Sequence, residues 1–486
     1  MKKLLIAISA VAALVGCAQN SPVLTVEGGR IQGVNADVKG VYVYRGIPYA
    51  APPIGDLRWK EPQPVVAWEG VKLCDKFGHP GYQSVHYPGG YTTEWGYGDE
   101  APYSEDCLYL NVWTKAPGEV DRKLPVAFWI HGGGYREGWG SEPEFDGQEW
   151  AGKDVVLVSF NYRLGVFGFL CHPELSAESH HGVSGNYGIL DQIAALKWVK
   201  ENIAQFGGDP DNVTILGQSA GAGSVRTLCE SPLTVGLFNK AVIMSGGGLN
   251  RDLQAPTNGR VVTSLESAEQ RCKEVLDWAG LTDLSKMRAA STEVLYSLSN
   301  IKNMVENPAP QGPMGSMMSM MRMFNSGITG SPVVDGYVSL RGFDEAALTD
   351  NLPHIPYMCG FTMNDMGNMA PNIADFCLNR ESVGDVCYAY EFARPLPTDG
   401  RPNVLEGAFH SSDLWFIFKS LKHCWRPWTD GDWDLSEVML TAWSNFVKTG
   451  NPGGNWEPYT NANPKFMVFK LDENDCEASA MGDPIK

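Results

Sequence analysis

The sequence has little positive charge and few metal-binding patterns. Its 486 residues include 38 Lys and Arg against 56 Asp and Glu, which gives a net charge of −18. No basic stripe is present, and phosphate binding needs concentrated positive charge, so we expect no nucleic-acid partner. The chain also lacks Cys-x-x-Cys pairs, and its nine His form no metal-ligand pattern with Cys or carboxylates. We therefore expect no metal.

Long apolar runs are also absent, except at the N-terminus. Two lysines precede an apolar run from Leu4 to Gly16. This run is well short of the ~20 residues that a bilayer core requires, so it predicts a secretory signal peptide and not a membrane span. The segment ends in a stretch that resembles the lipobox of bacterial lipoproteins, Leu14-Val15-Gly16-Cys17.

The lipobox resemblance implies that Cys17 is lipidated after cleavage of residues 1–16. Residues 17–22 would then be a tether, and residues 23–486 a single domain. The protein would be exported and anchored to a bacterial membrane through its N-terminal lipid. Because Ala18 is not the Asp that resembles an inner-membrane retention signal, we favour the outer membrane. The alternative is an ordinary signal peptide that happens to adjoin a Cys.

The middle of the chain alternates apolar strands with an amphipathic helix, and neither an internal repeat nor a long linker interrupts it. This alternation predicts an α/β fold with a mostly parallel sheet flanked by helices. We expect a helix over Asn186–Phe206. The candidate strands are rich in β-branched or aromatic residues and end at Gly or a polar turn: Pro125–Ile130, Val155–Phe160, Val213–Leu216, Ala241–Met244 and Tyr357–Gly360.

Residues 250–330 are an expected lid or cap insertion, and their composition is unusual. Seven Met lie between Met304 and Met323, interrupted by several Pro. Met is flexible and polarizable, so this cluster could line an adaptable apolar entrance to a pocket. A loosely specified apolar insertion packed on the body of the protein explains it equally well.

The strand Val213–Leu216 leads directly into Gly217-Gln218-Ser219-Ala220-Gly221. This pattern predicts a sharp turn from strand to helix, in which the glycines avoid Cβ clashes and Ser219 projects from the end of the strand. Ser219 is therefore a candidate nucleophile.

Three glycines follow another expected strand, in His131-Gly132-Gly133-Gly134-Tyr135. Consecutive glycines contribute no side chains to packing and cost backbone entropy. They suit a loop whose bare N–H groups approach a substrate oxygen that becomes negative during acyl transfer. The alternative is a tight loop without a chemical role.

These motifs and several others resemble the type B carboxylesterase/cholinesterase family of α/β hydrolases. The agreement extends from about Val23 to Phe469. The further matching stretches are Arg45–Gly55, Ser104–Val112, Phe206–Pro210, Trp443–Phe446 and Thr449–Pro452. The resemblance implies an α/β-hydrolase fold and a serine esterase without a cofactor.

The family's chain order, nucleophile then acid then histidine, directs the search for the other catalytic residues. Residues 407–415 look like the family's histidine segment, which makes His410 the expected general base. Residues 360–367 resemble the loop where relatives usually carry Glu, and here Asp365 takes that place. The alternatives are His423 and His354 for the base and Glu381 and Asp385 for the acid. Counting the loop back from Gly367 would give Met366, which cannot serve as an acid.

The resemblance also implies structural roles. Ion pairs are expected between Arg58 and Glu105 and between Arg163 and Asp191. Cys107 matches a family disulfide cysteine, and Cys74 is its nearest candidate partner. Gln218 stands where cholinesterases have Glu, so a negative charge beside the nucleophile is absent, which argues against a cationic choline substrate.

We therefore expect a serine carboxylic-ester hydrolase that forms an acyl-enzyme on small to medium uncharged esters. Ser219, His410 and Asp365 would form the triad, and the N–H groups of Gly133, Gly134 and Ala220 the oxyanion hole. One alternative is an esterase that removes acetyl or feruloyl groups from polysaccharide, which would suit a surface lipoprotein. Its aromatic candidates are Trp95, Trp139, Trp415, Trp425 and Trp428. The other alternative is a catalytically silent adhesion or binding protein.

Overall fold

The computed structural model describes residues 21–83, 89–97, 102–253, 263–298, 330–471 and 478–481. The expected signal segment and Cys17 lie outside the described residues, as does the methionine-rich stretch. None of the helices in these ranges combines the length and apolar character that crossing a bilayer requires.

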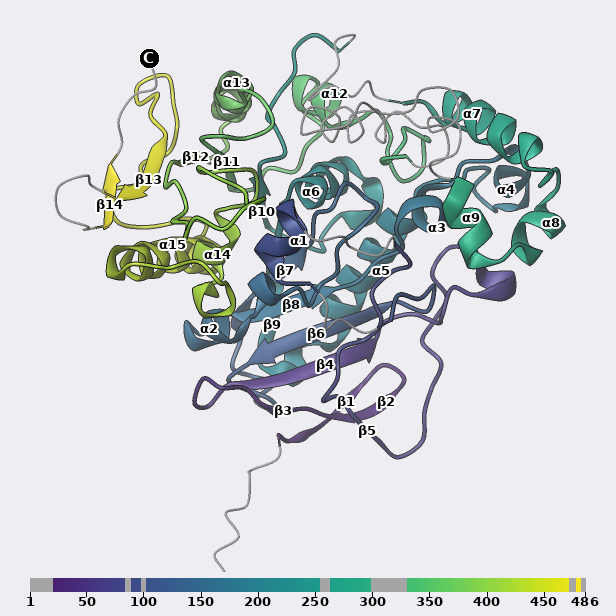
Figure 1. The fold of residues 1–486 in the computed structure, drawn as a ribbon, viewed down its shortest axis with the longest axis horizontal. Coiled ribbons are helices and arrows are strands. Elements are labelled where there is room, and N and C mark those ends of the chain that lie inside the picture. The colour runs from purple at the N-terminus through teal and green to yellow at the C-terminus, as the bar shows by residue number, and fades with distance from the viewer. Residues whose placement is uncertain are drawn as a thin grey trace, which may run out of the picture.

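A sheet of 11 strands forms the centre of the molecule (Figure 1). In spatial order its strands are β14 (Ala478–Met481), β13 (Met467–Leu471), β12 (Cys387–Phe392), β11 (Tyr357–Thr362), β10 (Lys240–Met244), β9 (Gly208–Gln218), β7 (Leu124–Ile130), β8 (Val156–Phe160), β6 (Tyr109–Thr114), β4 (Tyr42–Pro48) and β3 (Val34–Asn35). The strands from β13 to β8 run parallel, and antiparallel strands extend both edges. A small second sheet contains β1 (Val23–Val26), β2 (Gly29–Gln32) and β5 (Val71–Leu73).

The expected strands and helix are confirmed. The five candidate strands correspond to β7 through β11. The expected helix is α5 (Tyr187–Asn202), which a 3-10 turn continues over Ile203–Phe206. The mostly parallel sheet of the predicted α/β fold is therefore present.

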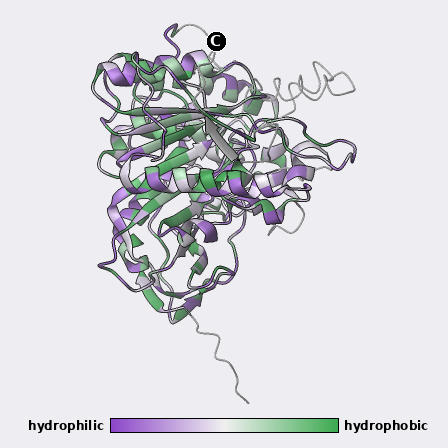
Figure 2. Cartoon of the chain, turned by 90° about the vertical axis from the view of Figure 1, so that its left-hand side faces the viewer, coloured by the Kyte–Doolittle hydropathy of each residue, from purple (hydrophilic) through white to green (hydrophobic). Residues whose placement is uncertain are grey.

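Alternate residues of the strands face opposite sides of the sheet, so each face has its own apolar core. Along β7, Phe128 belongs to one core and Trp129 to the other. Figure 2 shows mainly green, hydrophobic strands in the interior of the molecule. Helices α5, α6 (Ala220–Glu230), α12 (Phe343–Leu348) and α13 (Ala370–Ser382) cover the first face. Helices α2 (Gln148–Gly152), α14 (Leu414–Ile417) and α15 (Asp430–Thr449) cover the second.

A third, smaller apolar cluster holds the described part of the expected insertion. Helices α7 (Leu265–Trp278), α8 (Leu284–Ala289) and α9 (Thr292–Leu298) pack against α3 (Gly165–Phe169) and α4 (Pro173–Glu178). Figure 1 shows these helices gathered at one side of the sheet. The remaining described helix, α1 (Gly90–Trp95), joins the second core through the buried Trp95.

The expected disulfide between Cys74 and Cys107 is absent. Both residues are buried free thiols. Cys74 follows β5, and its main chain is held by Gln32 and Arg45. Burial raises the pKa of the Cys107 thiol, and Asp191 contributes to the shift, because Cys107 lies beside the Arg163–Asp191 pair. Both thiols therefore remain unpaired within the same apolar core.

Candidate active site

Ser219 occupies the turn between β9 and α6. Its φ of 58° and ψ of −120° are strained for a residue with a side chain. Its N–H donates to Met244 O at 2.9 Å, and its O accepts from Gly223 N–H at 2.9 Å. These bonds hold the strained turn in place and leave the Ser219 side chain partly exposed.

The flanking glycines are required by close backbone contacts. A Cβ on Gly217 would stand 2.3 Å from Gly221 O, and a Cβ on Gly221 would stand 2.1 Å from Ile130 O. Both distances are far inside van der Waals contact. Glycine at position 217 therefore allows the turn to close on itself, and glycine at position 221 allows it to approach β7.

The triple-glycine loop begins where β7 ends, beside this turn. Ile130 pairs with Gly217 in the parallel register, so the loops that follow β7 and β9 leave the same edge of the sheet. Gly133 and Gly134 have φ values of +93° and +63°, which favour glycine. In the described residues their N–H groups donate no hydrogen bond, so both remain available to a ligand. Ala220 begins α6, where helical N–H groups lack internal acceptors.

His131 lies beneath this loop and is an uncharged structural residue. Its ring stacks on Tyr162 at 4.4 Å, and its Nδ1 lies 3.0 Å from Gly132 O. Burial lowers the pKa of His131 to about 4. At neutral pH the ring therefore supports the loop without adding charge.

His410 and Asp365 are brought together from separate loops. Asp365 follows β11, and His410 lies in the loop that follows β12. His410 Nδ1 lies 2.6 Å from Asp365 Oδ1. Asn364 joins the two loops, because its N–H donates to Ala408 O and its Oδ1 accepts from Ala408 N–H, both at 2.9 Å. Tyr91 in α1 donates its hydroxyl to His410 O at 3.0 Å.

Asp365 is held in its ionised form. Its Oδ1 accepts from Met366 N–H at 2.7 Å, and its Oδ2 accepts from the N–H and hydroxyl of Thr362, both at 3.2 Å. Burial alone would raise the pKa of Asp365. The hydrogen bond and charge of His410, with the Ser245 hydroxyl and the Met366 N–H, outweigh that effect and lower it.

The alternative base and acid residues lie elsewhere. His423 contacts Asp146 at 3.1 Å, and His354 contacts Asp385 at 3.1 Å. Glu381 accepts from Asn461, and the Met366 side chain is 51% exposed. None of these side chains contacts His410 or Ser219.

The opposite edge of the His410 ring points toward the turn that carries Ser219. Its Nε2 lies 3.2 Å from the side-chain Nε2 of Gln218, the residue before Ser219. In this structure the Ser219 hydroxyl makes no hydrogen bond with any described residue. Catalytic hydrogen bonds are often loose before substrate binds. Gln218 and Ser219 are adjacent, so His410 Nε2 faces the turn that carries the Ser219 hydroxyl.

Two further residues near the pair were missed by the sequence analysis. Ser245, with φ of 51°, follows β10 and favours the ionised form of Asp365. Asp413, three residues after His410, is buried and accepts from the Tyr390 hydroxyl at 3.0 Å. Burial raises the pKa of Asp413 to about 7. Ser245 could have been found as the first polar residue after an expected strand, whereas nothing local distinguishes Asp413.

Both expected ion pairs are present. Arg58 Nη2 lies 2.5 Å from Glu105 Oε1, and Arg163 Nη2 lies 2.7 Å from Asp191 Oδ1. Arg58 also donates to the main chain of Arg288 and Ala290, which joins the N-terminal region to α8. These pairs support the fold and do not contact the Ser219 turn.

The tryptophans considered as sugar platforms are largely internal. Trp95, Trp139 and Trp415 are buried. Trp425 lies beneath the guanidinium groups of Arg401 and Arg426. Only Trp428 remains partly exposed without such a covering cation, so these five side chains do not form an exposed sugar-binding platform.

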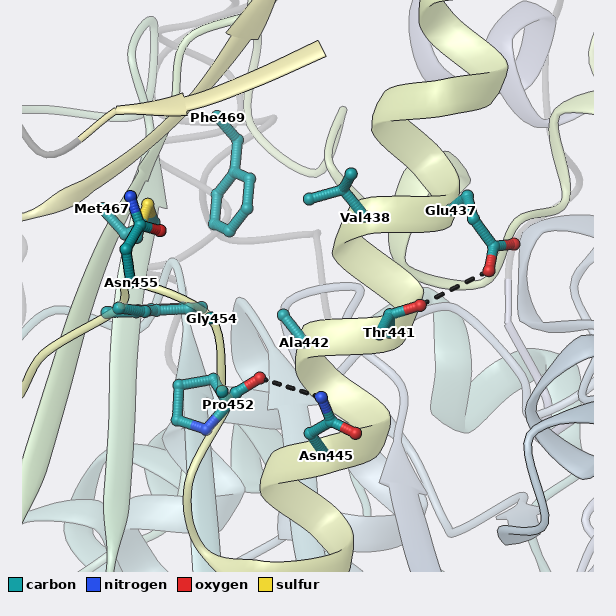
Figure 3. Close-up of a pocket in the computed structure, with 12 residues that line it drawn as sticks. Glu437, Val438, Thr441, Ala442, Asn445, Pro452, Gly454, Asn455, Met467 and Phe469 are labelled. Atoms are coloured by element: carbon teal, nitrogen blue, oxygen red, sulfur yellow. Dashed lines mark hydrogen bonds between the residues drawn. The ribbon is translucent and has the colours of Figure 1, made fainter.

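A separate groove of about 270 Å³ lies between α15 and β13 (Figure 3). Its walls include Val438, Ala442 and Phe469, and none of the predicted site residues lines it. In the parts of the chain that the structure describes, no three His, Cys, Asp or Glu side chains are arranged to hold a metal ion.

Comparisons with known proteins identify the family of the chain. The carboxylesterase family model matches residues 20–381 and 372–482. The chain is 38% identical to the fumonisin B1 esterase of Sphingopyxis macrogoltabida, over 91% of this chain and 74% of that protein. It is 32% identical to the para-nitrobenzyl esterase of Bacillus subtilis, over 94% and 97%. A solved Geobacillus stearothermophilus carboxylesterase aligns with a TM-score of 0.74 and 30% identity, over 95% and 98%.

The chain therefore belongs to the carboxylesterase family, and its fold is that of an α/β hydrolase. Within that family it is a carboxylic-ester hydrolase, since its relatives over most of its length are esterases. This finding confirms the expected ester hydrolase and goes against the alternative of a catalytically silent binding protein.

Proposed function

We propose that Ser219, His410 and Asp365 form the catalytic triad of this esterase. The observation that carries the proposal is the 2.6 Å contact between His410 Nδ1 and Asp365 Oδ1, with His410 Nε2 facing the Ser219 turn. His410 takes the Ser219 proton as the hydroxyl oxygen attacks the ester carbonyl. Asp365 holds the imidazole tautomer and stabilises its positive charge.

The N–H groups of Gly133, Gly134 and Ala220 stabilise the oxyanion in this proposal. Each such donor contributes about 3 to 4 kcal/mol of transition-state stabilisation. The tetrahedral intermediate collapses as His410 protonates the leaving alcohol, which leaves an acyl-enzyme on Ser219. His410 then removes a proton from water, whose oxygen attacks the acyl carbonyl. The second tetrahedral intermediate collapses as its bond to Ser219 Oγ breaks and His410 returns the proton to that oxygen, which releases the acid.

The test compares Ser219→Ala and a matched pair of histidine variants, His410→Asn and His423→Asn. Ser219→Ala and His410→Asn should abolish measurable ester hydrolysis with unchanged thermal unfolding, whereas His423→Asn should retain the parent rate. A fluorophosphonate probe should label the parent and not Ser219→Ala. Retained hydrolysis in Ser219→Ala would refute the assignment of the nucleophile.

We further propose that the substrates are small to medium uncharged esters. Gln218 supports this range, because a neutral amide stands beside the nucleophile. Rates on p-nitrophenyl esters of increasing acyl length should peak at short or medium chains. Acetylated and feruloylated xylan belong in the same assay, and faster release from xylan than from the simple esters would contradict this range.

We also propose export and lipid anchoring through Cys17, supported by the N-terminal sequence alone. In a diderm bacterium the parent protein should incorporate a fatty-acid label and sediment with outer membranes. Cys17→Ser should lose both properties but keep its specific activity. An unlabelled, freely released parent protein would contradict the anchor.

A further inference from the structure

Glu137 lies on the triple-glycine loop, next to the proposed oxyanion donors. The N–H groups of Arg136 and Glu137 both donate to Gly133 O at 3.0 Å, which folds the loop back on itself. As a result, Glu137 Cγ lies 3.2 Å from the point that a Cβ on Gly133 would occupy. The Glu137 side chain therefore starts beside Gly133, on the loop whose glycine N–H groups are available.

The Glu137 carboxylate has no partner among the described residues, unlike the acidic side chains around it. It makes no hydrogen bond or ion pair there, and its side chain is exposed. Glu142, by contrast, accepts from the Tyr97 hydroxyl at 2.6 Å and from Trp139 N–H at 2.8 Å. Glu94 is paired with Arg426. A structural role therefore accounts for Glu94 and Glu142 but not for Glu137.

The charge of Glu137 reaches the side of the site that holds His410. Burial raises the pKa values of Tyr91 and Tyr97, and the nearby Glu137 charge adds to both shifts. Tyr91 is the residue whose hydroxyl donates to His410 O. The Glu137 charge is thus close enough to be felt at Tyr91, the residue that holds the His410 main chain.

We propose that Glu137 is a specificity-determining residue, whose carboxylate disfavours esters with a negative charge near the scissile carbonyl and favours esters with a positive charge there. This inference rests on the proposed roles of Ser219, His410 and the glycine loop. It adds a charge preference to a site whose nucleophile is flanked by the neutral Gln218.

The preference that Glu137 gives for cationic over anionic esters depends on pH. Although the Glu137 side chain reaches solvent, the protein around it limits its hydration, and this effect and the Glu142 charge raise the pKa of Glu137 to about 7, while Arg136 opposes the shift. The titratable and charged groups that face it from the described residues are Tyr91, Tyr97, Arg136 and Glu142. Glu137 gains its charge as pH rises through about 7, so discrimination against anionic esters strengthens over that interval.

The experiment measures kcat/KM for neutral, anionic and cationic esters of matched size. One panel carries the charge in the acyl chain and a second carries it in the alcohol. Ratios between esters are compared at about pH 6 and about pH 8.5, because any pH effect that is common to all esters cancels in a ratio. For the parent, the cationic-to-anionic ratio should rise about tenfold over this interval in at least one panel.

Three variants complete the test. Glu137→Gln should remove that pH dependence and raise the anionic-to-neutral ratio about tenfold at the higher pH. Glu137→Lys should reverse the preference. The control is Glu119→Gln, an exposed residue on the turn before β7, at the opposite edge of the sheet, which should keep the parent ratios.

The outcomes separate this inference from the proposed function. The inference would be overturned if both Glu137 variants kept the kcat/KM ratios of the parent in both ester panels, while hydrolysis itself continued. Retained hydrolysis in Ser219→Ala would instead overturn the triad on which it rests.

Discussion

The two halves of the active site are positioned by different forces. The Ser219 turn and the glycine loop are fixed by steric contacts, since Cβ atoms at Gly217 and Gly221 would collide with backbone at 2.3 Å and 2.1 Å. The His410–Asp365 half is fixed by hydrogen bonds between two loops, with Asn364 as the connection. The first half therefore has no room for added atoms, whereas the second half is sensitive to a change in the charge of its side chains.

Because the two halves are fixed differently, substitutions in them should have different effects on folding and on catalysis. A substitution in the steric half should disturb folding as well as catalysis. A substitution of equal size in the hydrogen-bonded half should disturb catalysis while the fold persists, because the central sheet does not depend on it.

The largest effect is expected for Asp365→Asn, which changes the hydrogen-bonded half alone. The amide can donate to His410 Nδ1 and so favour the wrong imidazole tautomer. We expect kcat for a p-nitrophenyl ester to fall on the order of 10⁴-fold, about 5 kcal/mol, with the folded structure retained. Circular dichroism and steady-state kinetics on the same samples measure both quantities.

The matched control for Asp365→Asn is Glu381→Gln, which removes a carboxylate on α13 that bonds to Asn461. It should keep the parent kcat. A large loss in the control, or less than a tenfold loss in Asp365→Asn, would contradict the comparison.

Gly221→Ala tests the steric half. The added Cβ would stand 2.1 Å from Ile130 O, a backbone atom that cannot move without disturbing β7. We expect the free energy of unfolding to fall by about 3 kcal/mol, along with the activity. Gly152→Ala in α2 is the control, because its Cβ would meet only Val38 Cγ1 at 3.9 Å. Urea unfolding of both variants measures the difference, and equal stabilities would show that the turn can relax.

The steric half could be predicted from sequence because its requirements are local. A strand followed by Gly-x-Ser-x-Gly, and a strand followed by three glycines, each carry their geometry in consecutive residues. The five strands and α5 were predictable for the same reason, since their apolar patterns lie in short windows. The parallel register of β7 and β9 then places both loops at one edge of the sheet.

The hydrogen-bonded half depends on contacts that short windows do not contain. His410 and Asp365 were located through the family resemblance, and their 2.6 Å contact follows from the packing of two loops. Strands β12 and β13 escaped notice because mixed aromatic and polar residues obscure their pattern. The expected Cys74–Cys107 disulfide was wrong because a shared motif does not guarantee the partner's surroundings.

Within the hydrogen-bonded half, two carboxyl groups near His410 have pKa values that are shifted in opposite directions. The pKa of Asp365 is lowered, so its contribution to stability is present above its unfolded pKa and is lost as pH falls through its folded pKa. Burial raises the pKa of Asp413 from 3.8 to about 7. Between pH 3.8 and about pH 7, Asp413 keeps its proton in the folded state and loses it in the unfolded state, so its contribution to stability declines as pH rises.

Asp413→Asn removes this decline, and its effect should be the smallest of the three. Its free energy of unfolding relative to the parent should rise by on the order of 2 kcal/mol from about pH 4 to about pH 8, since Asn cannot ionise. Urea unfolding across that range measures the trend, with exposed Asp434→Asn on α15 as the control. A difference in the free energy of unfolding between Asp413→Asn and the parent that does not change with pH would mean that Asp413 carries the same charge in the folded and unfolded states. Burial would then not raise the pKa of Asp413, and the contrast with Asp365 would fail.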